Sequence, residues 1–145
     1  MKYIRIVTSI LILFAAAFIA GGETVKKDFQ NFGKESRLED LSAPVRCFFD
    51  AAALNDSKAL VTCFSDEVTV NIAGMRFDGL GEVAAFAERD IWGGKYRVEK
   101  VFKQKDKEIV HCLFWPRGWS APEPAIEYQF ETKNGKIVSW HGEYR

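Results

Sequence analysis

Apolar residues recur at helical spacing in the segment that follows Ser42. One face of this expected helix is formed by Val45, Phe48, Phe49, Ala52 and Ala53. Ser42 is suited to cap the helix, and Pro44 lies in its first turn, where proline's missing N–H is tolerated. The polar run Asn55-Asp56-Ser57 ends it, and a short second helix follows with apolar residues at Ala59, Leu60, Cys63 and Phe64. The pattern therefore predicts a helical hairpin.

Beyond Asp66 the apolar positions alternate with polar ones. Val68, Val70 and Ile72 are separated by single polar residues, which is the period of a half-buried strand. A short strand at 75–78 and a third helix ending at Gly93 are expected next. Four longer strands are predicted at 96–104, 108–115, 125–132 and 136–144. The turn Asn134-Gly135 marks the last hairpin, and a proline-rich loop at 116–124 separates the two hairpins.

Helices first and strands afterwards predict one α+β domain with an antiparallel sheet. We assign this domain to residues 42–145 and interpret 23–41 as a polar tether. Residues 1–22 are typical of a secretory signal peptide, because a basic start is followed by a short apolar run and then by small residues. The alternative is an uncleaved anchor, but the apolar run is shorter than the roughly 20 residues of a membrane span. We therefore expect export to the periplasm or the medium, with no stable membrane span after cleavage.

The charge balance argues against nucleic acid as a partner. The chain has 20 basic and 20 acidic residues, and removal of residues 1–22 takes away Lys2 and Arg5, which leaves a net charge of −2. Proteins that bind nucleic acid need clustered positive charge to displace counterions from the phosphates. We therefore expect neither DNA nor RNA as a ligand.

The three cysteines allow two interpretations. Cys47 and Cys63 lie on either side of the predicted helical turn and are placed to form a disulfide worth roughly 3 kcal/mol. Alternatively, these two residues and Cys112 are all small core residues, since each occupies an apolar position in a periodic segment. The periodicity favours the second interpretation.

Several segments resemble the nuclear-transport-factor-2-like superfamily, and its SnoaL-like branch in particular. The segments are 45–56, 60–64, 65–70, 77–86 and 130–144, and the resemblance covers residues 42–145. It implies a cone-shaped curved sheet that wraps around the N-terminal helical hairpin, with the third helix at the side and a pocket open at one end. Some members of this superfamily are isomerases, cyclases, dehydratases or epoxide hydrolases, and others only bind or dimerise.

The resemblance does not carry over the residues of a known reaction. Ketosteroid isomerase needs an aspartate base, a tyrosine and a protonated aspartate. An ungapped comparison places Ile72, Asp50 and Ile126 at these three positions, so isomerase chemistry is not expected. A shift of one residue would bring in Asn71 or Glu127 instead. Epoxide hydrolysis would need two carboxylates and an arginine, and Asp50, Arg76 and Asp78 supply these types, with no sign in the sequence that they converge.

The candidate pocket residues are aromatic or polar-tipped side chains of the predicted strands, namely Tyr96, His111, Trp115, Tyr128 and His141. The leading hypothesis is a pocket that binds a small apolar or aromatic ligand, with no cofactor and no metal. The first alternative is an enzyme of the dehydratase, cyclase or isomerase type that uses His111 or His141 as its acid or base. The second is a scaffold that docks another protein or forms a homodimer. Trp119, in the proline-rich loop, is either a lid over the pocket or part of an interface.

Overall fold

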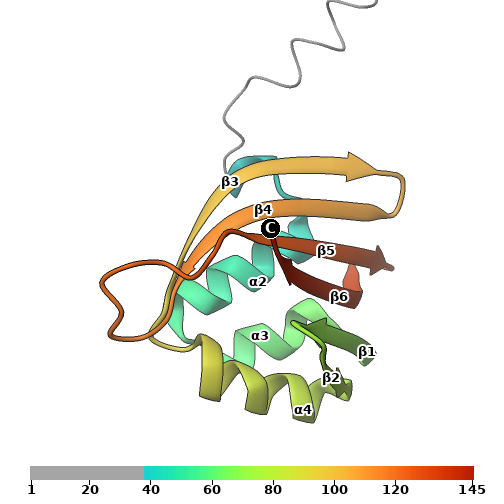
Figure 1. Cartoon of the computed structure of the whole chain (residues 1–145). Coiled ribbons are helices and arrows are strands. Elements are labelled where there is room, and N and C mark those ends of the chain that lie inside the picture. The colour runs from blue at the N-terminus through green and yellow to red at the C-terminus, as the bar shows by residue number, and fades with distance from the viewer. Residues whose placement is uncertain (1–37) are drawn as a thin grey trace, which may run out of the picture. The chain divides into compact units, whose positions relative to one another are not determined.

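The structure, a computed structural model, describes residues 38–145 (Figure 1). The helices are η1 (Leu38–Asp40), α2 (Ala43–Leu54), α3 (Ser57–Cys63), α4 (Gly79–Phe86) and the π-helical η2 (Ala87–Ile91). The strands are β1 (Phe64–Ile72), β2 (Met75–Asp78), β3 (Lys95–Gln104), β4 (Lys107–Trp115), β5 (Ile126–Lys133) and β6 (Lys136–Tyr144). None of the helices in this part of the chain combines the length and the apolar character needed to cross a membrane. The predicted signal peptide lies outside the described residues.

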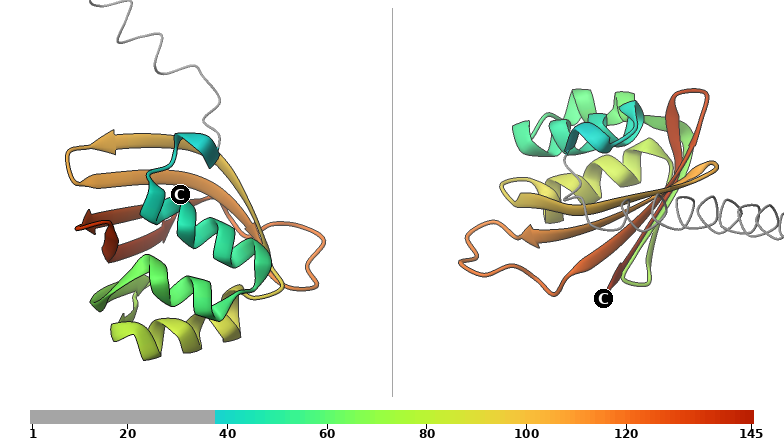
Figure 2. Two further views of the ribbon diagram at one scale, coloured as in Figure 1. Left: turned by 180° about the vertical axis from the view of Figure 1, so that it is seen from behind. Right: turned by 90° about the horizontal axis from the view of Figure 1, so that it is seen from above.

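The six strands form one curved sheet in the order β2-β1-β6-β5-β4-β3. The helices cover a single face of this sheet, with α2 beneath the long strands and α4 beside β1 and β2 (Figures 1 and 2). The expected α+β fold is confirmed, but the sheet is mixed and not purely antiparallel, because β1 pairs with β6 in parallel. The two strands are brought together by the fold of the whole domain, and no local pattern in the sequence records that pairing.

The core lies between α2 and the concave face of the sheet. Phe48 is fully buried there and packs at ring-centroid distances of 4.6 Å from Trp140 and 5.7 Å from Phe130. Leu41 is also buried, with 6% of its surface exposed. The packed domain therefore begins slightly before Ser42, and the last residues of the predicted tether belong to it.

The hairpin of α2 and α3 follows from its polar turn. Asn55 adopts a left-handed conformation with φ of 53° and ends α2. Asp56 then caps α3, because its carboxylate accepts hydrogen bonds of 3.0 Å from the backbone N–H groups of Lys58 and Ala59.

The first turn of α2 is not capped by the Ser42 side chain, contrary to the prediction from the sequence. The hydroxyl of Ser42 caps nothing and lies buried without a hydrogen-bond partner within the described residues. Its backbone N–H donates instead to the carboxylate of Glu108 on β4, with N–O distances of 3.0 and 3.2 Å. Glu108 is only 5% exposed, so it fastens the first turn of α2 to the sheet.

Substitution of Glu108 by alanine is expected to lower the free energy of unfolding by about 1–3 kcal/mol, because it leaves the partly buried N–H of Ser42 without its acceptor. Chemical denaturation of the purified protein measures this loss. Glu131→Ala is the matched control, since Glu131 lies on the same sheet but forms an exposed ion pair with Lys107 at 3.0 Å and should contribute at most about 1 kcal/mol. Equal losses in the two variants would contradict this role of Glu108.

The interpretation that all three cysteines are unpaired is wrong. Cys47 on α2 and Cys63 on α3 form a disulfide, with their Cα atoms 5.6 Å apart. The turn at Asn55 folds the two helices against each other, which places the two side chains face to face. Cys112 remains unpaired and fully buried on β4, and burial raises the pKa of its thiol to about 12.

Candidate functional site

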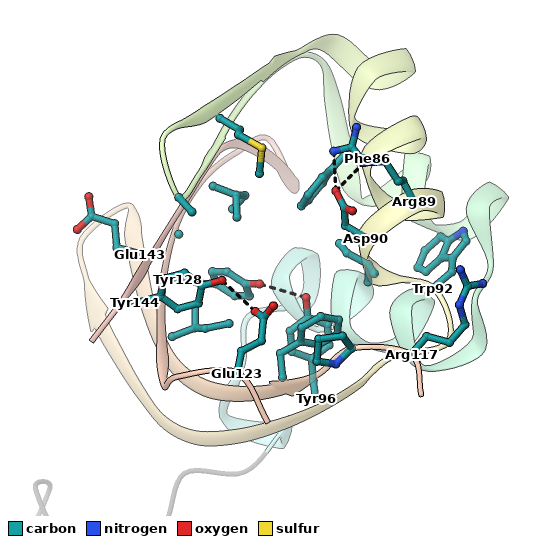
Figure 3. Close-up of a pocket in the computed structure, with 18 of the residues that line it drawn as sticks. Phe86, Arg89, Asp90, Trp92, Tyr96, Arg117, Glu123, Tyr128, Glu143 and Tyr144 are labelled. Atoms are coloured by element: carbon teal, nitrogen blue, oxygen red, sulfur yellow. Dashed lines mark hydrogen bonds and ion pairs between the residues drawn. The ribbon is translucent and has the colours of Figure 1, made fainter. Parts of the chain in front are cut away.

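A cavity of about 430 Å³ lies between the α4–η2 segment, the concave face of the sheet and the 116–124 loop (Figure 3). Its apolar wall is formed mainly by Ile72, Phe86, Ile91, Trp92, Phe114 and Ile126. Strands β3 and β5 add Tyr96 and Tyr128. The sheet is too curved to pack fully against the helices at this end of the domain, and space for a small molecule remains.

Two of the predicted pocket residues meet in this cavity. The hydroxyl oxygens of Tyr96 and Tyr128 are 3.1 Å apart and share a hydrogen bond, which Figure 3 shows as a dashed line. The ring of Tyr96 stacks on Phe114 at a centroid distance of 4.6 Å, while Tyr128 is only 3% exposed. One phenol donates to the other, so the pair keeps one O–H group that can donate to a ligand.

Burial raises the pKa of both phenols above the ordinary value of 10.0, and the bond between the two hydroxyls modifies this effect. Both side chains are therefore neutral at physiological pH. The pair offers a ligand hydrogen bonds without a charge.

The stability of the protein is expected to fall as the pH rises above about 10. The unfolded chain loses its tyrosine protons near pH 10.0, whereas the folded chain retains those of Tyr96 and Tyr128 to higher pH. The unfolded state then binds fewer protons, so increasing pH favours unfolding, and below pH 10 this contribution is absent. Denaturation at increasing pH measures the effect, and a Tyr96→Phe/Tyr128→Phe variant should lose most of it. Titration of both phenols near pH 10 in the folded protein would contradict the prediction.

Two carboxylates face the same cavity, and the sequence patterns did not reveal them. Asp90 is carried by η2, and one of its oxygens accepts hydrogen bonds of 2.9 and 2.6 Å from Arg89. Glu123, in the 116–124 loop, accepts a hydrogen bond of 3.2 Å from the hydroxyl of Tyr144. Figure 3 shows Asp90 and Glu123 on opposite sides of the cavity. The π-helical turn at η2, a distortion often found at functional sites, contributes to the placement of Asp90.

The positions compared with ketosteroid isomerase are apolar or distant from the cavity. Ile72 and Ile126 line the cavity, but neither side chain can accept a proton. Asp50 lies on an exposed part of α2, where it pairs with Arg46 at 3.6 Å. The three residues considered for epoxide hydrolysis do not converge either, because Arg76 pairs with Asp78 on β2 at 2.9 Å, away from Asp50.

The prediction that His111 projects into the pocket is wrong. Alternate residues of β4 face opposite sides of the sheet, and Val110, Cys112 and Phe114 occupy the concave side. His111 therefore lies on the outer face. There its Nε2 atom is 2.9 Å from a carboxylate oxygen of Glu127, and its Nδ1 atom accepts a hydrogen bond of 3.0 Å from Arg145.

His141 and Trp115 do not line the cavity either. The Nε2 atom of His141 lies 2.8 Å from the carboxylate of Glu143, and His141 is not among the residues that line the cavity. Trp115 shares the outer face of β4 with His111, and the guanidinium carbon of Arg97 lies 5.6 Å from the centre of its ring. Neither histidine lines this cavity, and acid–base chemistry through them stays a prediction.

Trp119 lies at the rim of the cavity and is 59% exposed. Its position is compatible with the predicted lid, whose function stays a prediction. Within residues 38–145, no group of three or more histidine, cysteine, aspartate or glutamate side chains is arranged to hold a metal ion.

No protein-family model matches the chain, and no curated protein sequence matches it either. Solved structures do match its fold. A Sinorhizobium meliloti protein proposed to be a polyketide cyclase has a TM-score of 0.65 at 23% identity, over 74% of this chain and 100% of that chain. A Mycobacterium tuberculosis protein in complex with estradiol-17β-hemisuccinate has a TM-score of 0.62 at 14% identity, over 70% and 91% of the two chains.

The Δ5-3-ketosteroid isomerase of a Mycobacterium species has a TM-score of 0.61 at 15% identity, over 71% of this chain and 91% of the isomerase. Identities this low establish a common fold and leave the chemistry open. The chain has the nuclear-transport-factor-2-like fold, which it shares with the polyketide cyclase-like and ketosteroid isomerase-like structures.

Proposed function

We propose that the protein binds a small, mainly apolar ligand in the cavity and does so outside the cytoplasm. The observation that carries this proposal is the buried pair of Tyr96 and Tyr128 at the wall of a 430 Å³ space. Sites for small molecules usually enclose about 300–1,000 Å³ and combine apolar walls with a few polar groups. We propose binding and no reaction, because both candidate histidines lie away from the cavity.

The comparison with solved structures supports a small molecule as the ligand. The Mycobacterium tuberculosis protein holds estradiol-17β-hemisuccinate, which has a rigid apolar body. In this chain, Tyr96 and Tyr128 would orient such a body through one hydrogen bond, and the aromatic wall would supply the contact area. Trp119 at the rim would then close over the bound ligand.

Two features support export. The first 22 residues have the pattern of a signal peptide. The disulfide between Cys47 and Cys63 is of a kind that persists in oxidising compartments and is rare in the cytosol. Fractionation of cells that express the full chain tests this proposal, and recovery of an intact, cytoplasmic protein with reduced cysteines would contradict it.

Binding can be tested with N-phenyl-1-naphthylamine, a neutral dye that fluoresces in apolar surroundings. We expect saturable fluorescence with the wild-type protein and a large loss of dye affinity in Ile72→Trp, because an indole ring at residue 72 would fill the cavity. Ile109→Trp is the matched control, since Ile109 lies on the outer face of β4. Equal binding by the two variants would contradict the proposal.

A second proposal is that the protein forms a homodimer through the outer face of the sheet. Phe102, Ile109 and Leu113 place half-exposed apolar side chains on this face, and exposed apolar surface of this kind is typical of interfaces. Sedimentation analysis should then give a dimer that Leu113→Glu converts to a monomer. A wild-type protein that stays monomeric at high concentration would contradict this proposal.

A further inference from the structure

Several hydrogen-bond donors at the cavity are already engaged with groups of the protein. Arg89 donates to Asp90, and Tyr144 donates to Glu123. The indole N–H of Trp92 donates away from the cavity, to the hydroxyl of Ser57 at 3.0 Å. Acceptors remain available, since the second carboxylate oxygens of Asp90 and Glu123 receive no hydrogen bond from the residues described by the structure.

The two carboxylates differ in how far their charge is neutralised. Asp90 is paired closely with the guanidinium of Arg89, at 2.6 Å. Among the residues that the structure describes, the carboxylate of Glu123 has only the uncharged hydroxyl of Tyr144 as a partner, so its negative charge is not balanced there. Arg117 is exposed and lies beside Trp92 in Figure 3, at the side of the cavity away from Glu123.

Glu123 is fixed next to the aromatic wall. Its backbone N–H donates to the carbonyl of Phe114 at 2.8 Å, which fastens the loop to the end of β4. Its charge contributes to the raised pKa of both Tyr96 and Tyr128, as expected for a carboxylate close to the two phenols. The rings of Tyr96, Phe114 and Tyr128 and the carboxylate of Glu123 line the same cavity.

A carboxylate beside aromatic rings is the arrangement that favours a cation. The negative faces of the rings attract a positive charge, and the carboxylate provides a charged acceptor for its N–H groups. We propose that the cavity selects ligands that carry a protonated amine on an apolar or aromatic body, with Glu123 as the specificity-determining counter-ion. This inference rests on the proposed ligand-binding function and names the class of ligand.

The test compares three ligands that share one ring system and differ in charge, namely 2-naphthylmethylamine, 2-naphthylmethanol and 2-naphthoate. Titration calorimetry of the purified protein at neutral pH should show the amine binding at least about tenfold more tightly than the alcohol, with the carboxylate weakest. Equal affinities for the three ligands, or tightest binding of the carboxylate, would overturn the inference. Failure of all three to bind would contradict the proposed function as well.

Substitutions test which residue is responsible for the preference for the amine over the alcohol. Glu123→Gln keeps an acceptor for Tyr144 and should reduce the affinity for the amine to that for the alcohol, with the alcohol's own affinity unchanged. Glu131→Gln is the matched control, because Glu131 is not among the residues that line the cavity and pairs with Lys107, and it should change neither affinity. Loss of the preference in Asp90→Asn and not in Glu123→Gln would overturn the assignment to Glu123. An equal loss for amine and alcohol in Glu123→Gln would show a structural role and would also overturn it.

Discussion

Phe48→Ala is expected to lower the free energy of unfolding by about 3–5 kcal/mol. The side chain is fully buried, so its removal leaves a cavity that the surrounding structure can only partly fill. It joins α2 to the sheet through the rings of Phe64, Tyr96, Phe130 and Trp140. Chemical denaturation of the purified protein measures the loss.

Leu54→Ala provides the control for this prediction, because Leu54 lies on the same helix but is 75% exposed. Its effect should stay within about 0.5 kcal/mol. A comparably small effect of Phe48→Ala would mean that α2 does not pack into the curved sheet as described. The cavity would then lack its scaffold.

Removal of the disulfide is expected to lower the free energy of unfolding by roughly 3 kcal/mol, because the bridge closes a loop with a sequence separation of 16 residues. The Cys47→Ala/Cys63→Ala variant, compared with the wild-type protein by denaturation, measures this contribution. The variant is less stable mainly because the unfolded chain gains conformational entropy when the disulfide is absent.

A reductant distinguishes the contribution of the disulfide bond to stability from the effect of replacing the two cysteine side chains. Dithiothreitol should destabilise the wild-type protein and leave the stability of Cys47→Ala/Cys63→Ala unchanged, because the remaining Cys112 is already a free, buried thiol. If the reductant has the same effect on both proteins, the account of the bridge is wrong.

Features that depend on neighbouring residues were predictable from the sequence. The apolar spacing around Phe48 predicted a helix that the structure places at Ala43–Leu54. The turn Asn134-Gly135, with φ values of 52° and 73°, connects β5 and β6 as expected. These patterns reflect local backbone preferences and one-sided burial, and both can be read over a few residues.

Features that depend on distant residues were not predictable. Both faces of β4 carry apolar side chains, so alternation defined the two faces without showing that His111 and Trp115 lie on the outer one. The parallel pairing of β1 with β6, and the hydrogen bond from Ser42 to Glu108, join residues far apart in the chain. The disulfide depends in the same way on how closely two helices approach.

The site was predicted only in part for the same reason. Tyr96 and Tyr128 were found as polar-tipped aromatic residues of strands, and the structure places both at the cavity. Asp90 and Glu123 were missed because neither belongs to a recognisable motif. Asp90 follows other charged residues in a helical segment, and Glu123 lies between two prolines in a loop.

The most direct test of the central claim is a crystal structure of the protein grown with 2-bromonaphthalene, whose bromine atom can be located by anomalous scattering. We predict a bromine peak inside the cavity, among Ile72, Phe86 and Tyr128. Bromine bound only at the outer face of the sheet, with the cavity filled by its own side chains, would contradict the claim that this fold encloses a ligand site.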